Sequence, residues 1–277
     1  MATRRVTAAR AVVGDLLRTP KRGDLVVEEI KRWIVTREMK PGDKLPKEAE
    51  LQAMFSVSKG TIREALKSLD VQGFISVSTG PSGGATVGEV PFERTFQLVQ
   101  NYLFFKDVDV GDIYAVRRIL EPELAAGAVP HLTKRDIAAL EASIETCAPA
   151  PASEAHALKQ RQEDLHFHDI FAEANPNPFL RFACQMINQM LRRLVVFGGH
   201  PLHASNTELG RTNVIAHRAI VEAARRRDAE KVRRLMLAHI IEAESHVTRM
   251  RGAVSSRLVL DSEMRVSVTP RRAGDRS

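Results

Sequence analysis

Three histidines and one aspartate in the C-terminal half of the chain have the spacing of a metal site. Asp164 and His168 are four residues apart, so on a helix they share one face and can bind one ion. His217 and His239 each lie eleven residues from Asp228, a natural N-cap for a helix. In an antiparallel helical hairpin that turns at Asp228, residues equidistant from the turn lie at one height. The spacing therefore allows one carboxylate and three imidazoles to reach a single ion.

These donors suit a divalent transition metal such as Zn, Ni, Mn, Co or Fe(II), and a six-coordinate ion would keep positions open for an anionic effector. A histidine is more often an ordinary core or surface residue, and spacing alone leaves both interpretations of the four residues open. The remaining histidines are assigned to that ordinary class: His131, His156, His166, His200, His203 and His246.

Other polar residues of the same half could contact an effector. Arg117 is one of the few charged residues in the otherwise apolar stretch 113–124, and its two-pronged donors could hold a carboxylate. The alternative is a buried pair with Glu121, four residues further on, and the sequence does not decide between them. Asn188 and Arg192 lie on one face of their expected helix and are further candidates.

A second group of chemically informative residues lies near the N-terminus. Ser58 is the expected N-cap of a helix whose first turns carry Lys59, Thr61 and Arg63. Because a helix fits the major groove of DNA and presents its first turns to base edges, these three are the predicted readers, with Arg63 suited to guanine. The alternative is that the cations form a solvated helix face. The full predicted DNA-binding set is Lys47, Ser58, Lys59, Thr61, Arg63, Lys67 and Gly83.

The elements expected around these residues follow a recognisable order. Helices are predicted over 24–38, 47–55 and 58–70, and strands over 74–78 and 85–87. In the second helix Leu51, Met54 and Phe55 are expected to face inward, and in the first strand Ile75 and Val77 share one side. Three helices followed by a glycine-tipped hairpin form a winged helix-turn-helix.

Beyond residue 90 no segment has the pattern of a strand. Helices are predicted over 92–105, 109–129, 133–147, 154–174, 177–197, 206–227 and 228–249, with a break at 198–201. We therefore expect a mainly α protein whose C-terminal part is a helical bundle. The predicted divisions are a flexible basic arm (1–23), the winged helix-turn-helix (24–90), a linker and connecting helix (91–104), the helical bundle (105–250) and a flexible basic tail (251–277).

Length and composition set the class of protein. A chain of 277 residues with 44% hydrophobic residues is long enough for about two domains. No apolar run reaches the roughly 18 residues that span a bilayer, and the N-terminus lacks the apolar core of a signal peptide. An organellar transit peptide is the alternative for residues 4–18. Two cysteines are too few for a disulfide framework. We expect a cytoplasmic protein with no membrane partner.

The net charge of +7 is concentrated at the two ends of the chain. Residues 1–23 hold six Lys or Arg and one acid, and residues 251–277 hold six Arg and three acids. The body between them is close to neutral. The ends can add salt-dependent attraction to phosphates, which carries no sequence information, so specific DNA recognition must come from the fold.

The motifs of the N-terminal third resemble the GntR family of bacterial regulators. The resemblance is carried by residues 40–46 (KPGDKLP), 57–66 (VSKGTIREAL) and 73–75 (GFI). There are two departures: Ala49 stands where such proteins usually carry a DNA-contacting arginine, and the wing at 79–83 lacks the usual basic residues. The operator is therefore expected to differ from the common one, with binding more dependent on the arm and on Lys47.

The helical half resembles the FCD effector domain of the FadR subfamily over most of residues 105–245. The motifs are residues 114–122 (YAVRRILEP), 164–168 (DLHFH), 217–220 (HRAI) and 238–239 (AH). Acyl-CoA-binding members of that subfamily lack the metal site, so retention of all four ligands implies the metal-dependent branch. The resemblance also implies a bacterial, nucleoid-associated protein.

Together these observations predict a transcriptional regulator, expected to be a repressor and not an enzyme. It would bind double-stranded operator DNA as a homodimer, since one winged helix buries too little DNA for high specificity. A small organic acid at the metal would control operator affinity. The alternatives are a metal-dependent hydrolase-like domain fused to a DNA-binding module, and a DNA-binding protein without a ligand. Loss of metal and small-molecule binding would favour the last.

Overall fold

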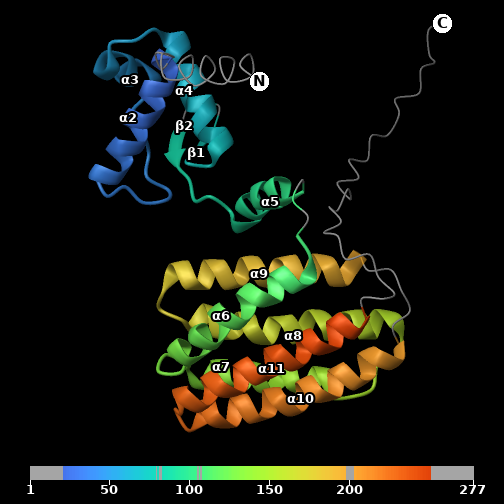
Figure 1. Ribbon diagram of the computed structural model, residues 1–277. Helices are drawn as coiled ribbons and strands as arrows, with labels where there is room; N and C mark the ends of the chain where they lie inside the picture. The colour runs from blue at the N-terminus through green and yellow to red at the C-terminus, as the bar shows by residue number, and fades with distance from the viewer. Residues whose placement is uncertain are drawn as a thin grey trace, which may run out of the picture. The chain divides into compact units, whose positions relative to one another are not determined.

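A computed structural model of the chain describes residues 21–78, 80, 83–104, 106, 108–197 and 203–250 (Figure 1). These residues form two compact units that divide between Thr95 and Phe96. The basic ends at 1–20 and 251–277 and the expected break at 198–201 lie outside the described residues. Helices dominate the described chain, and its one sheet has two strands, which confirms the prediction of a mainly α protein.

The first unit is a winged helix-turn-helix. Its helices are α2 (Arg22–Thr36), α3 (Glu48–Phe55) and α4 (Lys59–Gln72), followed by β1 (Ile75–Ser78) and β2 (Gly84–Val87). The strands pair antiparallel, with Ile75 opposite Val87 and Ser78 opposite Gly84. Gly73 ends α4 in the left-handed conformation, with a φ of 82°, which glycine adopts at little cost.

One apolar core holds this unit together. Its buried members come from all three helices and both strands and include Val26, Ile30, Leu45, Leu51, Ile62, Leu66, Leu69, Ile75 and Val87. One side chain expected inside, Met54, is not, and Val77 is exposed although it shares a side of its strand with the buried Ile75. Met54 is 49% exposed because the two-turn helix α3 meets the core along the row of Leu51 and Phe55, leaving Met54 on its flank. Val77 is 45% exposed, since only the start of β1 is covered by the core.

The first helix also begins earlier than predicted. The predicted range starts at Asp24, but α2 begins at Arg22, so Asp24 lies in the first turn. A carboxylate in that turn faces the positive end of the helix dipole, so Asp24 stabilises the helix start without capping it.

The second unit is a helical bundle. After α5 (Phe92–Leu103) come α6 (Val110–Ala128), α7 (Lys134–Cys147), α8 (Glu154–Ala174), α9 (Pro178–Phe197), α10 (His203–Arg225) and α11 (Ala229–Met250), each within a few residues of its predicted range. In this bundle α6 packs on α9 and α11, while α8 packs on α7 and α9 and α10 packs on α7 and α11 (Figure 1). None of the described helices is both long enough and apolar enough to cross a membrane.

Side-chain caps fix where several bundle helices begin. The Thr133 hydroxyl accepts the N–H of Asp136 at the start of α7, and the Ser153 hydroxyl accepts that of His156 at the start of α8. At the start of α11 the Asp228 carboxylate accepts the N–H of Lys231 at 2.9 Å. Because each cap is set by local sequence, it also sets the height of every residue further along its helix.

Candidate metal centre and DNA-binding surface

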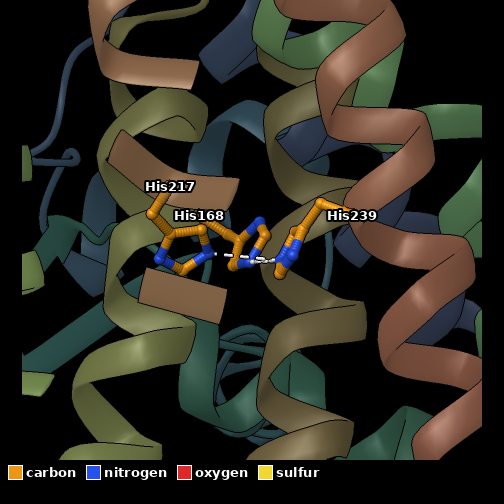
Figure 2. A group of neighbouring side chains, drawn as sticks. All are labelled: His168, His217 and His239. Carbon is orange, nitrogen blue, oxygen red and sulfur yellow. Dashed lines mark hydrogen bonds between the residues drawn. The ribbon is translucent and has the colours of Figure 1, made fainter. Parts of the chain in front are cut away.

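Three histidines from three helices meet inside the bundle. His168 of α8, His217 of α10 and His239 of α11 are all buried, and their rings point toward one another (Figure 2). The Nε2 atom of His239 lies 3.2 Å from that of His217 and 3.3 Å from that of His168. Every ligand atom of this group lies within 4.8 Å of the others.

The α10–α11 hairpin brings two of these rings to the same level. The turn lies between Arg225 and Ala229, with Arg227 in the left-handed conformation at a φ of 57°. The Arg227 guanidinium donates to the carbonyl oxygens of Val129 and Leu132, at 2.8 Å for Leu132, which ties the turn to the end of α6. The equal spacing of His217 and His239 from this turn thus produces their contact.

A buried carboxylate orients the third ring. Glu121 of α6 lies 2.5 Å from Nδ1 of His168 and also pairs with Arg117. Burial alone would raise the pKa of Glu121, but Arg117 and His168 hold that pKa well below its usual range. An ionised carboxylate at Nδ1 favours a proton there, which leaves the lone pair of His168 on Nε2, facing the other two rings.

The other two rings are kept neutral by their surroundings. Burial lowers the pKa of His217 well below its usual value, and the neighbouring His239 and His168 lower it further. Burial, His168 and Arg117 likewise lower the pKa of His239. The Phe167 ring stacks on that of His217 with 3.7 Å between centroids and 4° between planes, which fixes the orientation of His217. Neutral imidazoles are the form that binds metal ions.

The three nitrogens fit a metal ion. Nitrogen ligands about 2.0–2.1 Å from a tetrahedral zinc ion are about 3.3 Å apart, and the two Nε2–Nε2 distances in the histidine group are 3.2 and 3.3 Å. Without a cation, Nε2 of His239 carries either one proton or one lone pair for two contacts, which leaves at least one of them poorly bonded. An ion accepts all three lone pairs at once.

The fourth predicted ligand lies at the edge of this group. The Asp164 carboxylate is 3.9 Å from Nδ1 of His217 and accepts the side-chain amide of Asn213 at 3.0 and 3.1 Å. Burial raises the pKa of Asp164, opposed by His168 and Asn213. The structure therefore brings together three of the four predicted ligands and places the carboxylate beside them.

The predicted effector contacts are engaged within the protein. Arg117 forms the buried pair with Glu121 that the sequence left open as an alternative. On α9 the side-chain amide of Asn188 donates to Asp169 at 2.8 Å, and Arg192 pairs with the same carboxylate. Asn188 keeps one side-chain oxygen that is buried and has no hydrogen-bond partner in the described part of the chain.

Two of the three predicted DNA readers, together with Lys67, lie on one exposed face of α4. Lys59, Arg63 and Lys67 follow one another at intervals of four residues, and all three are exposed. The Arg63 guanidinium lies 3.1 Å from the carboxylate of Glu48 on α3, a contact that orients it from the neighbouring helix. Figure 1 shows α3 beside α4 within this unit.

The other predicted DNA contacts have local structural roles as well. Ser58 caps α4 by accepting the N–H of Thr61 at 3.2 Å, and the two hydroxyls lie 2.9 Å apart. Lys47 is exposed at the N-cap of α3, where its backbone N–H donates to Glu50 at 2.8 Å. Gly83 lies in the wing turn and donates its N–H to Gly80 at 3.0 Å.

Comparison with known families accounts for both units. Residues 23–84 match the family described as bacterial regulatory proteins, gntR family, and residues 112–242 match the FCD domain, so the two matches span most of the chain. The chain belongs to the GntR family and carries an FCD domain. It is therefore a transcriptional regulator, from a family of DNA-binding proteins rather than enzymes.

Individual members of the GntR family resemble the chain over most of its length. The HTH-type transcriptional repressor NanR of Escherichia coli (strain K12) is 26% identical over 228 residues, which cover 79% of this chain and 82% of that protein. NanR of Salmonella newport (strain SL254) is 25% identical over the same share of this chain and 83% of its own length. The solved structure of Streptococcus agalactiae GntR covers 80% of this chain and 99% of its own at 24% identity, and its TM-score of 0.54 indicates the same fold.

Some residues of this GntR-family site escaped the sequence analysis. Asn213 holds Asp164, and its position four residues before His217 on α10 was a signal for a shared face. The contact between Glu121 and His168 had no such signal, because the two residues come from different helices. Phe167 adjoins a candidate ligand in sequence, but its stacking on His217 depends on how α8 packs against α10.

Proposed function

We propose that this regulator is a repressor whose affinity for operator DNA is set by a small organic acid bound at a metal ion in the FCD domain. The observation that carries the proposal is the convergence of three buried, neutral imidazoles on one point. Repression is inferred from the similarity to NanR repressors. DNA binding is inferred from membership of the GntR family.

In this proposal His168, His217 and His239 supply three nitrogens and Asp164 a carboxylate oxygen to a Zn, Ni, Mn, Co or Fe ion. Such an ion, when bound, supplies a Lewis acid with open positions for the carboxylate of an effector. The protein's own part is to keep the imidazoles neutral and correctly turned. Burial keeps His217 and His239 neutral, and Glu121 orients the ring of His168.

The residues predicted to contact the effector receive distinct roles. Arg117 acts through Glu121, because its guanidinium keeps that carboxylate ionised beside His168. Asn188 can accept a hydrogen bond from an effector hydroxyl through its unpartnered oxygen. Arg192 is held in place by Asp169 and would contact an effector carboxylate only with its remaining donors.

On the DNA side we propose that α4 reads the operator through Lys59 and Arg63, with a homodimer placing two such helices on a near-palindromic site. Apolar side chains exposed on two neighbouring bundle helices favour a surface for a second copy. They are Val116 and Ile119 of α6, the latter 70% exposed, and Ile241 of α11. Effector binding would favour one arrangement of the dimer and so change its affinity for operator DNA, with a coupling free energy of about 1–3 kcal/mol. Operator DNA must then change the affinity for the effector by the same factor.

The test compares two buried histidines of the same helix. His239 belongs to the metal group, whereas His246 pairs with Glu242 one turn before it. We expect His239→Ala to lose bound metal, measured by elemental analysis, together with stabilisation by organic acids in thermal melts. It should still bind operator in the absence of acid, and His246→Ala should keep all three properties. A His239→Ala protein that retains metal and releases operator normally would show that sensing does not depend on the metal.

A further inference from the structure

A small pocket lies beside Asp164, on the side of the bundle formed by the α7–α8 connection and α10. Its volume is about 150 Å³. Its polar lining comes from Gln160, Arg161 and Asp164 of α8 and from Arg211 and Asn213 of α10, and small apolar residues form the rest. Since Asp164 borders both this pocket and the histidine group, the pocket is adjacent to the proposed metal.

The outer wall of the pocket is tied in place. The side-chain amide of Gln160 donates to the carbonyl oxygens of Thr146, at 3.1 Å, and Pro149, at 2.8 Å. The Cys147 thiol donates to the backbone carbonyl of Gln160 at 3.3 Å. These bonds hold the proline-containing connection against α8, so the pocket is formed before a ligand arrives.

The pocket has two arginines that lack a partner. Within the described part of the chain neither the half-buried Arg161 nor the exposed Arg211 forms an ion pair or a hydrogen bond. The Nε atom of Arg161 is buried with no acceptor. A buried donor without a partner costs free energy that a bound acceptor recovers, so this atom points to a ligand. Burial also lowers the pKa of Arg161, with Glu154 opposing.

The charges of the pocket favour an anion. Asp164 is its acidic lining residue and, under the proposed function, is committed to the metal. Two guanidinium groups then remain without an ion-pair partner among the described residues. Arginine recognises carboxylate and phosphate through paired N–H donors, which makes these groups the natural occupants.

We propose that Arg161 and Arg211 bind a second anionic group of the effector, so that the effector is a small di-anion. This inference rests on the proposed function, because the first acid group is the one directed at the metal. A cavity of about 150 Å³ holds roughly six non-hydrogen atoms, the size of benzene, which limits the effector to a short chain. The second group is a carboxylate or a phosphate monoester.

The experiment measures acid binding to the metal-loaded full-length protein by calorimetry. The probes are the dicarboxylates from malonate to adipate, 3-phosphoglycerate, and the matched monocarboxylates from propionate to hexanoate. We expect at least one di-anion to bind about tenfold or more tightly than its matched monocarboxylate, the gain typical of a charge-assisted hydrogen bond. Whether the dicarboxylates or 3-phosphoglycerate bind more tightly shows whether the second anionic group is a carboxylate or a phosphate monoester.

Three variants separate charge from shape. Arg161→Gln and Arg211→Gln should each lose most of the di-anion preference while leaving metal content and monocarboxylate affinity unchanged. Gly210→Ala is the matched control, because it adds a methyl group to the pocket lining where a Cβ meets no atom within 4 Å. It should keep the di-anion preference.

The possible failures are distinguishable. If monocarboxylates bind in a metal-dependent way but di-anions bind no better, or if both glutamine variants keep the preference, the second anionic subsite is refuted while the metal-centred function stands. If the metal-loaded wild-type protein binds none of these acids, both proposals are overturned.

Discussion

The buried pair of Arg117 and Glu121 allows a sharp test of how the bundle supports the metal group. Both side chains are less than 5% exposed and contact each other through two atom pairs. Glu121→Gln keeps the shape of the side chain but leaves the Arg117 charge buried without a counter-ion. Breaking a buried pair in this way costs about 3–5 kcal/mol. We expect the free energy of unfolding of the metal-free second unit to fall by that amount.

The matched comparison removes both charges. In Arg117→Met/Glu121→Leu no ion is left buried, and replacing a buried pair by apolar residues is often neutral. The carboxylate 2.5 Å from Nδ1 of His168 is also lost, and leaving that buried ring nitrogen without a polar neighbour costs about 1–3 kcal/mol. The double variant should therefore be more stable than the single Glu121→Gln variant, by about 2 kcal/mol.

The assay is urea unfolding of the chelator-treated protein, followed by circular dichroism. Trp33, the single tryptophan, lies in the first unit, so its fluorescence reports a transition that neither variant should move. Both variants should also bind metal about 10–100-fold more weakly, because His168 loses the carboxylate that orients it. A double variant no more stable than Glu121→Gln would refute the argument.

Three further predictions concern the DNA readers, the buried imidazoles and the basic N-terminus. Lys59→Ala/Arg63→Ala should fold but lose about 1–3 kcal/mol of operator discrimination in footprinting, and unchanged footprints would contradict the role of α4. Because the pKa values of His217 and His239 are lowered, the unfolded chain binds protons below about pH 6.5 that the folded metal-free protein does not. Stability should therefore fall as pH falls from 7.5 to 5.5, by at most about 1.4 kcal/mol per pH unit for each histidine, and replacing both by glutamine should flatten that slope. Deletion of residues 1–20 should weaken the salt dependence of DNA binding in titrations while preserving the preferred sequence, and a changed preference would mean that this segment reads bases.

Local patterns in the sequence were enough to predict most helices and the wing. Caps such as Ser58 and Asp228, and the glycine at the end of α4, act on backbone groups within a few residues, so their effect does not depend on the rest of the fold. The same local regularity explains why His217 and His239 meet, since each helix turns at a constant rate from a shared turn. Where packing decides, as at Met54, local pattern was insufficient.

The identity of each partner inside the bundle was decided by tertiary structure. The sequence left Arg117 between an effector and Glu121, and packing of α6 against the other helices buries the pair and points the carboxylate at His168. It also pairs the Asp164 carboxylate with Asn213 at the edge of the histidine group. Burial removes water as a competing partner, so a charge must take whichever neighbour the fold supplies. Spacing along one helix allows a pair such as Arg117 and Glu121, but contacts between helices decide whether that pair is buried and which further neighbour it takes.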